Sequence, residues 1–241
     1  MLTATIEELR SVALAVDDAS GYFPAMYARI TSEVETAAAA GRFADPQRME
    51  AFARAFAEWY PRMRHDDDAR VPGCWQAAAD VAGDGRLMIV QHLLLGINAH
   101  VNHDLPQVVV ALAPRGTELA GMRADFDAVN DILAESLPMV LRSLGTVSRW
   151  VNTAAVLGGG RMFDFSLKVA RRRAWEAAVR MHALADDDRA EYAVELDRLV
   201  RVLAYMVVHP GPVSSLGVAV GRRCEERDPR AVTLKLLGPL A

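Results

Sequence analysis

The sequence predicts an all-α protein, with residues 1–241 forming a single domain of about eight to ten packed helices. Apolar residues recur at the helical period along most of the chain. Glycine, proline and capping residues divide this pattern into segments of helix length. No stretch alternates apolar and polar residues for long enough to predict a strand, and no internal repeat is present. These observations together favour packed helices without a sheet.

In the first third of the chain we expect helices over residues 5–17, 22–40, 45–60 and 74–82, with a loop over 65–73. Thr5 and Glu8 have the spacing of a capping box. Gly41 is placed to end the second helix. An aspartate followed by Pro46 is a typical helix start, and Pro61 is expected to end the helix that begins there.

In the rest of the chain we expect helices over residues 86–105, 122–144, 146–157, 163–184 and from 188 to 209. Pro106 is expected to end or interrupt the first of these. The glycines at 158–160 predict a break between the third and the fourth. Asp188 and Glu191 open the last helix, whose apolar residues follow the 3.6 period until Pro210 closes it.

The composition excludes several classes of protein. Hydrophobic residues make up 52% and charged residues 24% of the 241 residues, which is typical of a soluble globular protein with a sizeable core. The net charge of −4 gives no reason to expect nucleic acid as a partner. Cys74 and Cys224 lie far apart, which argues against a disulfide framework or a cysteine zinc site and fits a reducing compartment.

No targeting or membrane segment is evident in the sequence. The first residues have neither the basic nor the apolar region of a secretory signal. No apolar stretch approaches the roughly 20 residues that span a bilayer, so we expect no membrane span and a cytoplasmic location.

One run, residues 91–106, combines three of the six histidines with two asparagines and an aspartate in strongly apolar sequence. Polar groups are costly in apolar surroundings unless they are bonded or have a function. On an α-helix, His92, Gly96, His100, His103 and Asp104 fall within about a third of a turn. The run is therefore the first candidate for a functional site.

The opposite side of the same helix carries Asn98 and Asn102, one turn apart. We expect them, with Gly96, to bind or orient a substrate. Gly96 permits close approach to the helix by a ligand or by another helix, and the sequence leaves both open. A purely structural network is the alternative, in which the asparagines bridge neighbouring helices and His103 faces solvent.

The pair His100 and Asp104 suggests two chemistries, because both side chains lie one turn apart on one face. They could bind a divalent cation such as zinc, manganese or iron, with His92 as a third ligand. Further ligands could come from Asp127 or Asp131, or from Asp164, all outside the run. Alternatively, the carboxylate could orient His100 as a general base.

Three other features are expected to have structural roles. Cys74 and Trp75 most simply pack in the core, as do Trp59 and Tyr60. The run from Arg171 to Arg173 is expected to lie on a solvated helix face, because only some of three consecutive residues can point inward.

The string from Gly96 to Leu105, preceded by His92, resembles the core signature of an uncharacterised family, DUF5995. Later blocks around Phe126–Leu133 and Phe165–Trp175 are also similar to that family. The resemblance implies a shared fold and directs attention to five positions: His92, Asn98, His100, Asn102 and Asp104. A weaker resemblance, limited to the spacing of His100 and Asp104, is to the α-helical zinc phospholipase C and P1 nuclease group.

These observations support three functional hypotheses. The first is an enzyme acting on a small-molecule substrate, in which His92, His100 and Asp104 are catalytic or bind a metal that hydrolyses an ester or phosphoester. The second is a metal-free lyase, isomerase or cyclase acting on an apolar small molecule. The third is a helical protein that binds a ligand without catalysis.

Overall fold

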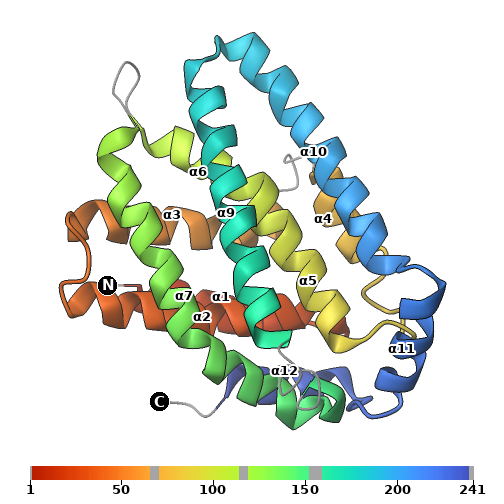
Figure 1. Ribbon diagram of the computed structural model, residues 1–241. Coiled ribbons are helices and arrows are strands. Elements are labelled where there is room, and N and C mark those ends of the chain that lie inside the picture. Colours follow the sequence, from red (N-terminus) through yellow and green to blue (C-terminus); the bar gives the residue numbers. More distant parts are fainter. Residues whose placement is uncertain (1, 66–70, 114–118, 152–158, 239–241) are drawn as a thin grey trace.

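The computed structural model describes residues 2–65, 71–113, 119–151 and 159–238 (Figure 1). These residues form helices and no strand, apart from one isolated antiparallel bridge between Ser148 and Glu225, so the predicted all-α class is confirmed. The α-helices are α1 (Thr3–Leu14), α2 (Tyr22–Ala39), α3 (Pro46–His65), α4 (Gly73–Ala79), α5 (Ile89–Ala99), α6 (Leu105–Leu112), α7 (Ala120–Val147), α9 (Gly159–Ala183), α10 (Asp186–Val208), α11 (Pro212–Arg222) and α12 (Pro229–Leu237).

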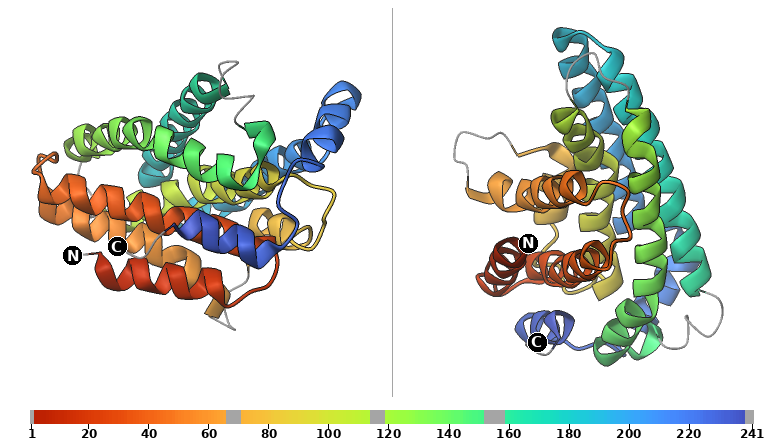
Figure 2. Two further views of the ribbon diagram at one scale, coloured as in Figure 1. Left: turned by 90° about the horizontal axis from the view of Figure 1, so that it is seen from below. Right: turned by 90° about the vertical axis from the view of Figure 1, so that its left-hand side faces the viewer.

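The helices cross in two groups. The amino-terminal helices α1, α2 and α3 run side by side, with α12 against α1 and α2 (Figures 1 and 2). Helices α7, α9 and α10 run steeply across them (Figure 1). Helices α5 and α6 pass through the middle and contact members of both groups, so the candidate run lies at the centre of the protein.

The central helix is continuous from Ile89 to Leu112 but widens in the middle. Residues His100–Asp104 form one π-helical turn, in which the amide of Leu105 donates to the carbonyl of His100. Pro106 follows directly and has no amide hydrogen. In a regular α-helix its ring would crowd the carbonyl four residues earlier, and the wider turn relieves this. The predicted interruption is therefore a local widening, and the helix continues beyond it.

Two other helices also contain a proline: the sequence led us to expect a helix end at Pro61, whereas Pro138 lies within the predicted helix over 122–144. Helix α3 runs through Pro61 to His65, and α7 contains Pro138 at its middle. Each proline removes one backbone hydrogen bond from its helix. Residues 66–70, most of the predicted loop, lie outside the described residues.

Several predicted boundaries need correction. The capping box at Thr5 is absent, because α1 begins at Thr3 and Thr5 is buried inside it. The predicted start of a separate helix at 146 is also wrong: α7 extends to Val147, and Ser148 is extended where it pairs with Glu225. Helix resumes over residues 149–151. Residues 152–158 lie outside the described residues, while the next two glycines begin α9. Helices α11 and α12 were not predicted.

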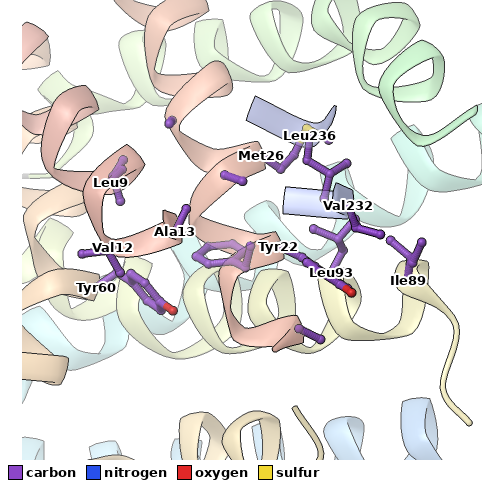
Figure 3. Packing of buried hydrophobic residues seen from close by; sticks show 14 of the residues in the cluster. Leu9, Val12, Ala13, Tyr22, Met26, Tyr60, Ile89, Leu93, Val232 and Leu236 are labelled. Atoms are coloured by element: carbon purple, nitrogen blue, oxygen red, sulfur yellow. The ribbon is translucent and has the colours of Figure 1, made fainter. Parts of the chain in front are cut away.

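Two hydrophobic clusters form the core. One joins α1, α2, α5 and α12 and includes the ten residues labelled in Figure 3. The other joins α3, α6, α7 and α9. Tyr27 and Ile97 pack against both clusters, so the central helix and α2 connect them. The apolar stripe expected on α10 is only partly buried: Val200 is in the core, whereas Leu199 and Leu203 are exposed.

At Gly96, α5 lies in close contact with Phe23 of α2. A β-carbon there would lie 2.5 Å from Cγ and 2.7 Å from Cβ of Phe23. Phe23 in turn packs against the rings of Tyr60, Trp75 and His100. The close approach that the sequence left open is therefore to another helix.

We expect Gly96→Ala to destabilise the fold by about 1–3 kcal/mol, because Phe23 must move within a packed core. The matched control is Gly121→Ala in α7, where a β-carbon meets nothing within 4 Å. This control should be neutral or gain up to about 1 kcal/mol. Chemical denaturation of the two variants provides the measurement, and equal behaviour would contradict the packing role of Gly96.

Candidate functional site

The buried carboxylate of Asp104 is the centre of the candidate site. It is 0% exposed and receives three side-chain contacts. Trp75 Nε1 donates to Oδ2 at 3.0 Å, His100 Nδ1 lies 3.3 Å from Oδ2, and His103 Nδ1 lies 2.8 Å from Oδ1. These donors compensate for the loss of water around the carboxylate. The π-turn permits this arrangement, since it carries both histidines and the aspartate within five residues.

His100 lies on one side of Asp104 and lines an apolar cavity. Its Nδ1 hydrogen is directed to Asp104, which leaves Nε2 as a proton acceptor. Nε2 is buried and has no hydrogen-bond partner among the described residues. The ring stacks on Phe56, with centroids 3.7 Å apart and planes 10° from parallel. Burial lowers the pKa of His100 despite the opposing effect of Asp104, so the imidazole is neutral.

The cavity beside His100 has a volume of about 140 Å³. Most of its wall is aliphatic or aromatic, from α2, α3, α5, α7 and α9. An engineered apolar cavity of similar size, about 150 Å³, binds benzene. The space therefore suits a molecule with about one ring, and it is too small for a nucleotide or a sugar chain.

Three further polar residues line this cavity, Tyr27, Thr31 and Arg171, and the hydroxyl of Thr31 donates to the carbonyl of Tyr27 at 2.9 Å. The ring centroids of Tyr27 and His100 lie 4.5 Å apart. Burial raises the pKa of the Tyr27 hydroxyl well above the ordinary value. Arg171 donates to Asn130 Oδ1 at 2.6 Å and to the carbonyl of Phe126 at 2.8 Å. Burial lowers the pKa of Arg171 to about 10, which leaves it charged at neutral pH. The lining of the cavity thus combines one base with the polar side chains of Tyr27, Thr31 and Arg171.

The arginine run is a correction to the sequence analysis. Arg172 and Arg173 are exposed as expected, but Arg171 is buried. Arg171 lies in the block Phe165–Trp175 of the family resemblance, and it bonds to Asn130 and Phe126 in the other block, Phe126–Leu133. The pairing of Phe126 and Trp175, with ring centroids 4.9 Å apart, belongs to the same unit.

His103 lies on the other side of Asp104 and is buried, in contrast to the solvent-facing alternative. It lines a separate cavity of about 620 Å³ between α4, α6 and α10. In the regular α-helix assumed in the sequence analysis, His103 would lie beside His92 and His100. The π-turn changes the direction of the residues within it, so His100 and His103 face different cavities.

His92 is separated from both of these residues. It lines a third cavity of about 250 Å³ together with Gly96 and residues of α4, and its ring packs edge-on against Tyr22 at 5.9 Å. Burial lowers its pKa to about 4. It therefore does not share the cavity of His100.

The two asparagines connect the central helix to α10. Asn98 Nδ2 donates to the carbonyl of Val200 at 2.9 Å, and Asn102 Nδ2 donates to Asn98 Oδ1 at 3.0 Å. These contacts correspond to the bridging alternative, because both amides bond within the protein. They hold α10 against the candidate site.

The metal site expected from the sequence is not assembled. The ligand atoms of His92, His100 and Asp104 do not form a group of metal-binding dimensions anywhere in the described parts of the chain. Asp127 pairs with Arg123 at 2.6 Å on the surface. Asp131 is exposed on the same helix, and Asp164 pairs with Lys168 at 3.0 Å.

Sequence reasoning did not assign to the site four residues that the structure brings there, namely Tyr27, Phe56, Trp75 and Arg171. Their sequence positions are far apart, and aromatic residues are common in a core. The one available signal was Arg171, a charged residue within a block of family resemblance.

A family model described as a family of unknown function (DUF5995) matches residues 2–210. The chain belongs to this family. The match includes the whole candidate site and leaves out α11 and α12. No curated protein and no solved structure matches the chain, so the resemblance to the zinc phospholipase C and P1 nuclease group has no support. Among the described residues, no helix is long and apolar enough to cross a membrane.

We expect Asp104→Ala to destabilise this DUF5995 protein by about 3–5 kcal/mol, because three buried donors lose their acceptor. Asp127→Ala is the control, since it breaks only a half-exposed ion pair and should cost at most about 1 kcal/mol. Urea denaturation at neutral pH measures both. A loss below 1 kcal/mol in Asp104→Ala would show that the carboxylate is not the centre of the network.

Stability should fall as the pH is lowered from 6.5 towards 4. The folded pKa of His92, about 4, is below its unfolded value of 6.5, so the unfolded chain binds more protons in this window. The effect reaches up to about 3 kcal/mol near pH 4, and buried His100 acts in the same direction. Denaturation at pH 7 and pH 4.5 should show a smaller loss in His92→Gln than in wild type. The exposed His209→Gln should keep the wild-type profile.

Proposed function

We propose that this protein is an enzyme that transfers a proton on a small, mainly apolar molecule bound in the 140 Å³ cavity, with His100 as general base. The observation that carries the proposal is the buried Nε2 of His100. It has no partner among the described residues, while Nδ1 is held by Asp104. Buried polar atoms normally have a partner, so an unpaired atom in a cavity wall is an exception that a ligand would explain.

The imidazole has the properties that a general base needs. Burial keeps it neutral, and Asp104 fixes both its tautomer and its orientation. When Nε2 takes a proton, the nearby carboxylate stabilises the imidazolium that forms. Phe56 holds the ring in place by stacking.

The lining also supports a class of substrate. Arg171 and Tyr27 carry hydrogen-bond donors in the wall of a largely apolar space, and such donors suit a carbonyl or carboxylate oxygen. A base that removes a proton next to such an oxygen produces negative charge on it, which these donors stabilise. An isomerase or lyase acting on a small carbonyl compound is the reaction class that fits this arrangement. It is the metal-free hypothesis of the sequence analysis.

The test is deuterium exchange into bound ligands. A panel of one-ring and short-chain aldehydes, ketones and carboxylic acids is first screened for binding by ligand-observed NMR. Binders are then incubated with the enzyme in D₂O. We expect protein-catalysed exchange at the carbon next to the carbonyl, reduced by about 10²–10⁴-fold in His100→Phe.

His100→Phe retains a flat ring against Phe56, so binding should survive, and His92→Gln is the control that should keep full exchange. Exchange that persists in His100→Phe would exclude His100 as the base. Binding without any exchange in the wild type would instead favour the ligand-binding hypothesis.

A further inference from the structure

A second group of chemically active side chains lies on the opposite side of Asp104 from the proposed substrate cavity. Cys74 Sγ, a ring nitrogen of His103 and a carboxylate oxygen of Asp197 all lie within 4.8 Å of one another. They come from α4, the π-turn and α10, which are far apart in the sequence. Cys74 and His103 are buried, and Asp197 is half-buried. The proposed function uses none of the three.

We propose that Cys74, His103 and Asp197 bind one transition-metal ion, with zinc as the preferred metal. Thiolate, imidazole and carboxylate are the three ligand types of protein zinc sites. Calcium and magnesium are excluded by the sulfur and nitrogen ligands, since these ions take oxygen ligands. The inference goes beyond the proposed function and does not depend on it.

The orientation of His103 supports this assignment. Its Nδ1 donates to Asp104 at 2.8 Å, so Nε2 carries the lone pair. A metal-binding histidine almost always donates its other N–H to a carboxylate or a carbonyl. Asp104 therefore occupies the position of the carboxylate that orients a zinc ligand. The side-chain amide of Gln107, 3.2 Å from Nε2, would have to turn away when the metal binds.

Asp197 is held in place by the start of α4. Its Oδ2 accepts from the amide of Gly73 at 3.0 Å, and Oδ1 accepts from the amide of Cys74 at 2.8 Å. A carboxylate has about four acceptor positions, so these two bonds leave room for a metal. Glycine at position 73 permits the contact, because a β-carbon there would lie 2.8 Å from Asp197 Oδ2 and 2.5 Å from Cδ of Arg201.

The thiolate of Cys74, and not the thiol, is the form that binds a metal. Binding of zinc therefore displaces the thiol proton.

Three protein ligands leave a fourth position open. His103 and Asp197 line the 620 Å³ cavity, so water can reach the group. Closed structural zinc sites have four protein ligands, whereas sites with three protein ligands bind water or a substrate in the fourth position. Arg198 and Arg201 line the same cavity and favour an anionic fourth ligand.

The experiment uses the full chain without a histidine tag, equilibrated with zinc and then with cobalt(II). We expect one zinc per chain by elemental analysis. The cobalt form should show the near-ultraviolet absorption that arises from thiolate-to-cobalt charge transfer. This absorption reports a cysteine ligand in the wild-type protein. It is assigned to Cys74 when it persists in Cys224→Ser, a variant that changes only an exposed side chain.

Variants then identify the ligands. Asp104→Asn should weaken zinc binding by about 10–100-fold, as expected for a residue that only orients a ligand. Cys74→Ser and His103→Gln each remove a ligand and should weaken zinc binding by more than about 100-fold. His92→Gln is the matched control and should bind as the wild type does, and circular dichroism verifies that each variant is helical. Absence of bound zinc, absence of the charge-transfer absorption, or zinc that persists in both Cys74→Ser and His103→Gln would overturn the proposal.

Discussion

The buried carboxylate of Asp104 is the constraint on which the rest of the site depends. A fully buried carboxylate is stable in a protein only when donors surround it. Here the donors are one indole and two imidazoles, from Trp75, His100 and His103. Meeting that requirement fixes the tautomers of both histidines and anchors α4 to the central helix. The same interaction therefore stabilises the fold and leaves Nε2 of each imidazole as the nitrogen with a lone pair.

Because of the π-turn, the carboxylate of Asp104 lies between the two proposed sites. In a regular helix, His100 and His103 would project towards neighbouring parts of one face. The wider turn directs them to different cavities, one of about 140 Å³ and one of about 620 Å³. Single π-turns often occur at functional sites, since they cost stability and persist where something compensates. Here Pro106 and the Asp104 network both favour the widened turn.

The two proposed sites differ in the chemistry they support. The cavity beside His100 is largely apolar, with the donors of Arg171 and Tyr27 in its wall, and suits proton transfer on a small carbonyl compound. The group around His103 has sulfur, nitrogen and oxygen atoms beside a more polar cavity, and suits a metal. Both histidines donate to Asp104. A metal bound to His103 would therefore strengthen the bond from His103 to this carboxylate, which also stabilises the imidazolium of His100. The two sites are thus coupled through one side chain.

The sequence by itself determined the helical class and the position of the central run, and it singled out His100 and Asp104 as candidate site residues. Periodicity and local polarity suffice for these conclusions, because they depend on residues close together in the chain. Only the tertiary structure decided which cavity each histidine faces, since that depends on a backbone widening that a regular projection omits. It also decided that Gly96 accommodates Phe23 and that the asparagines bond to α10. Cys74, Asp197 and Arg171 could not be assigned from the sequence, because their roles arise from contacts between helices that are distant along the chain.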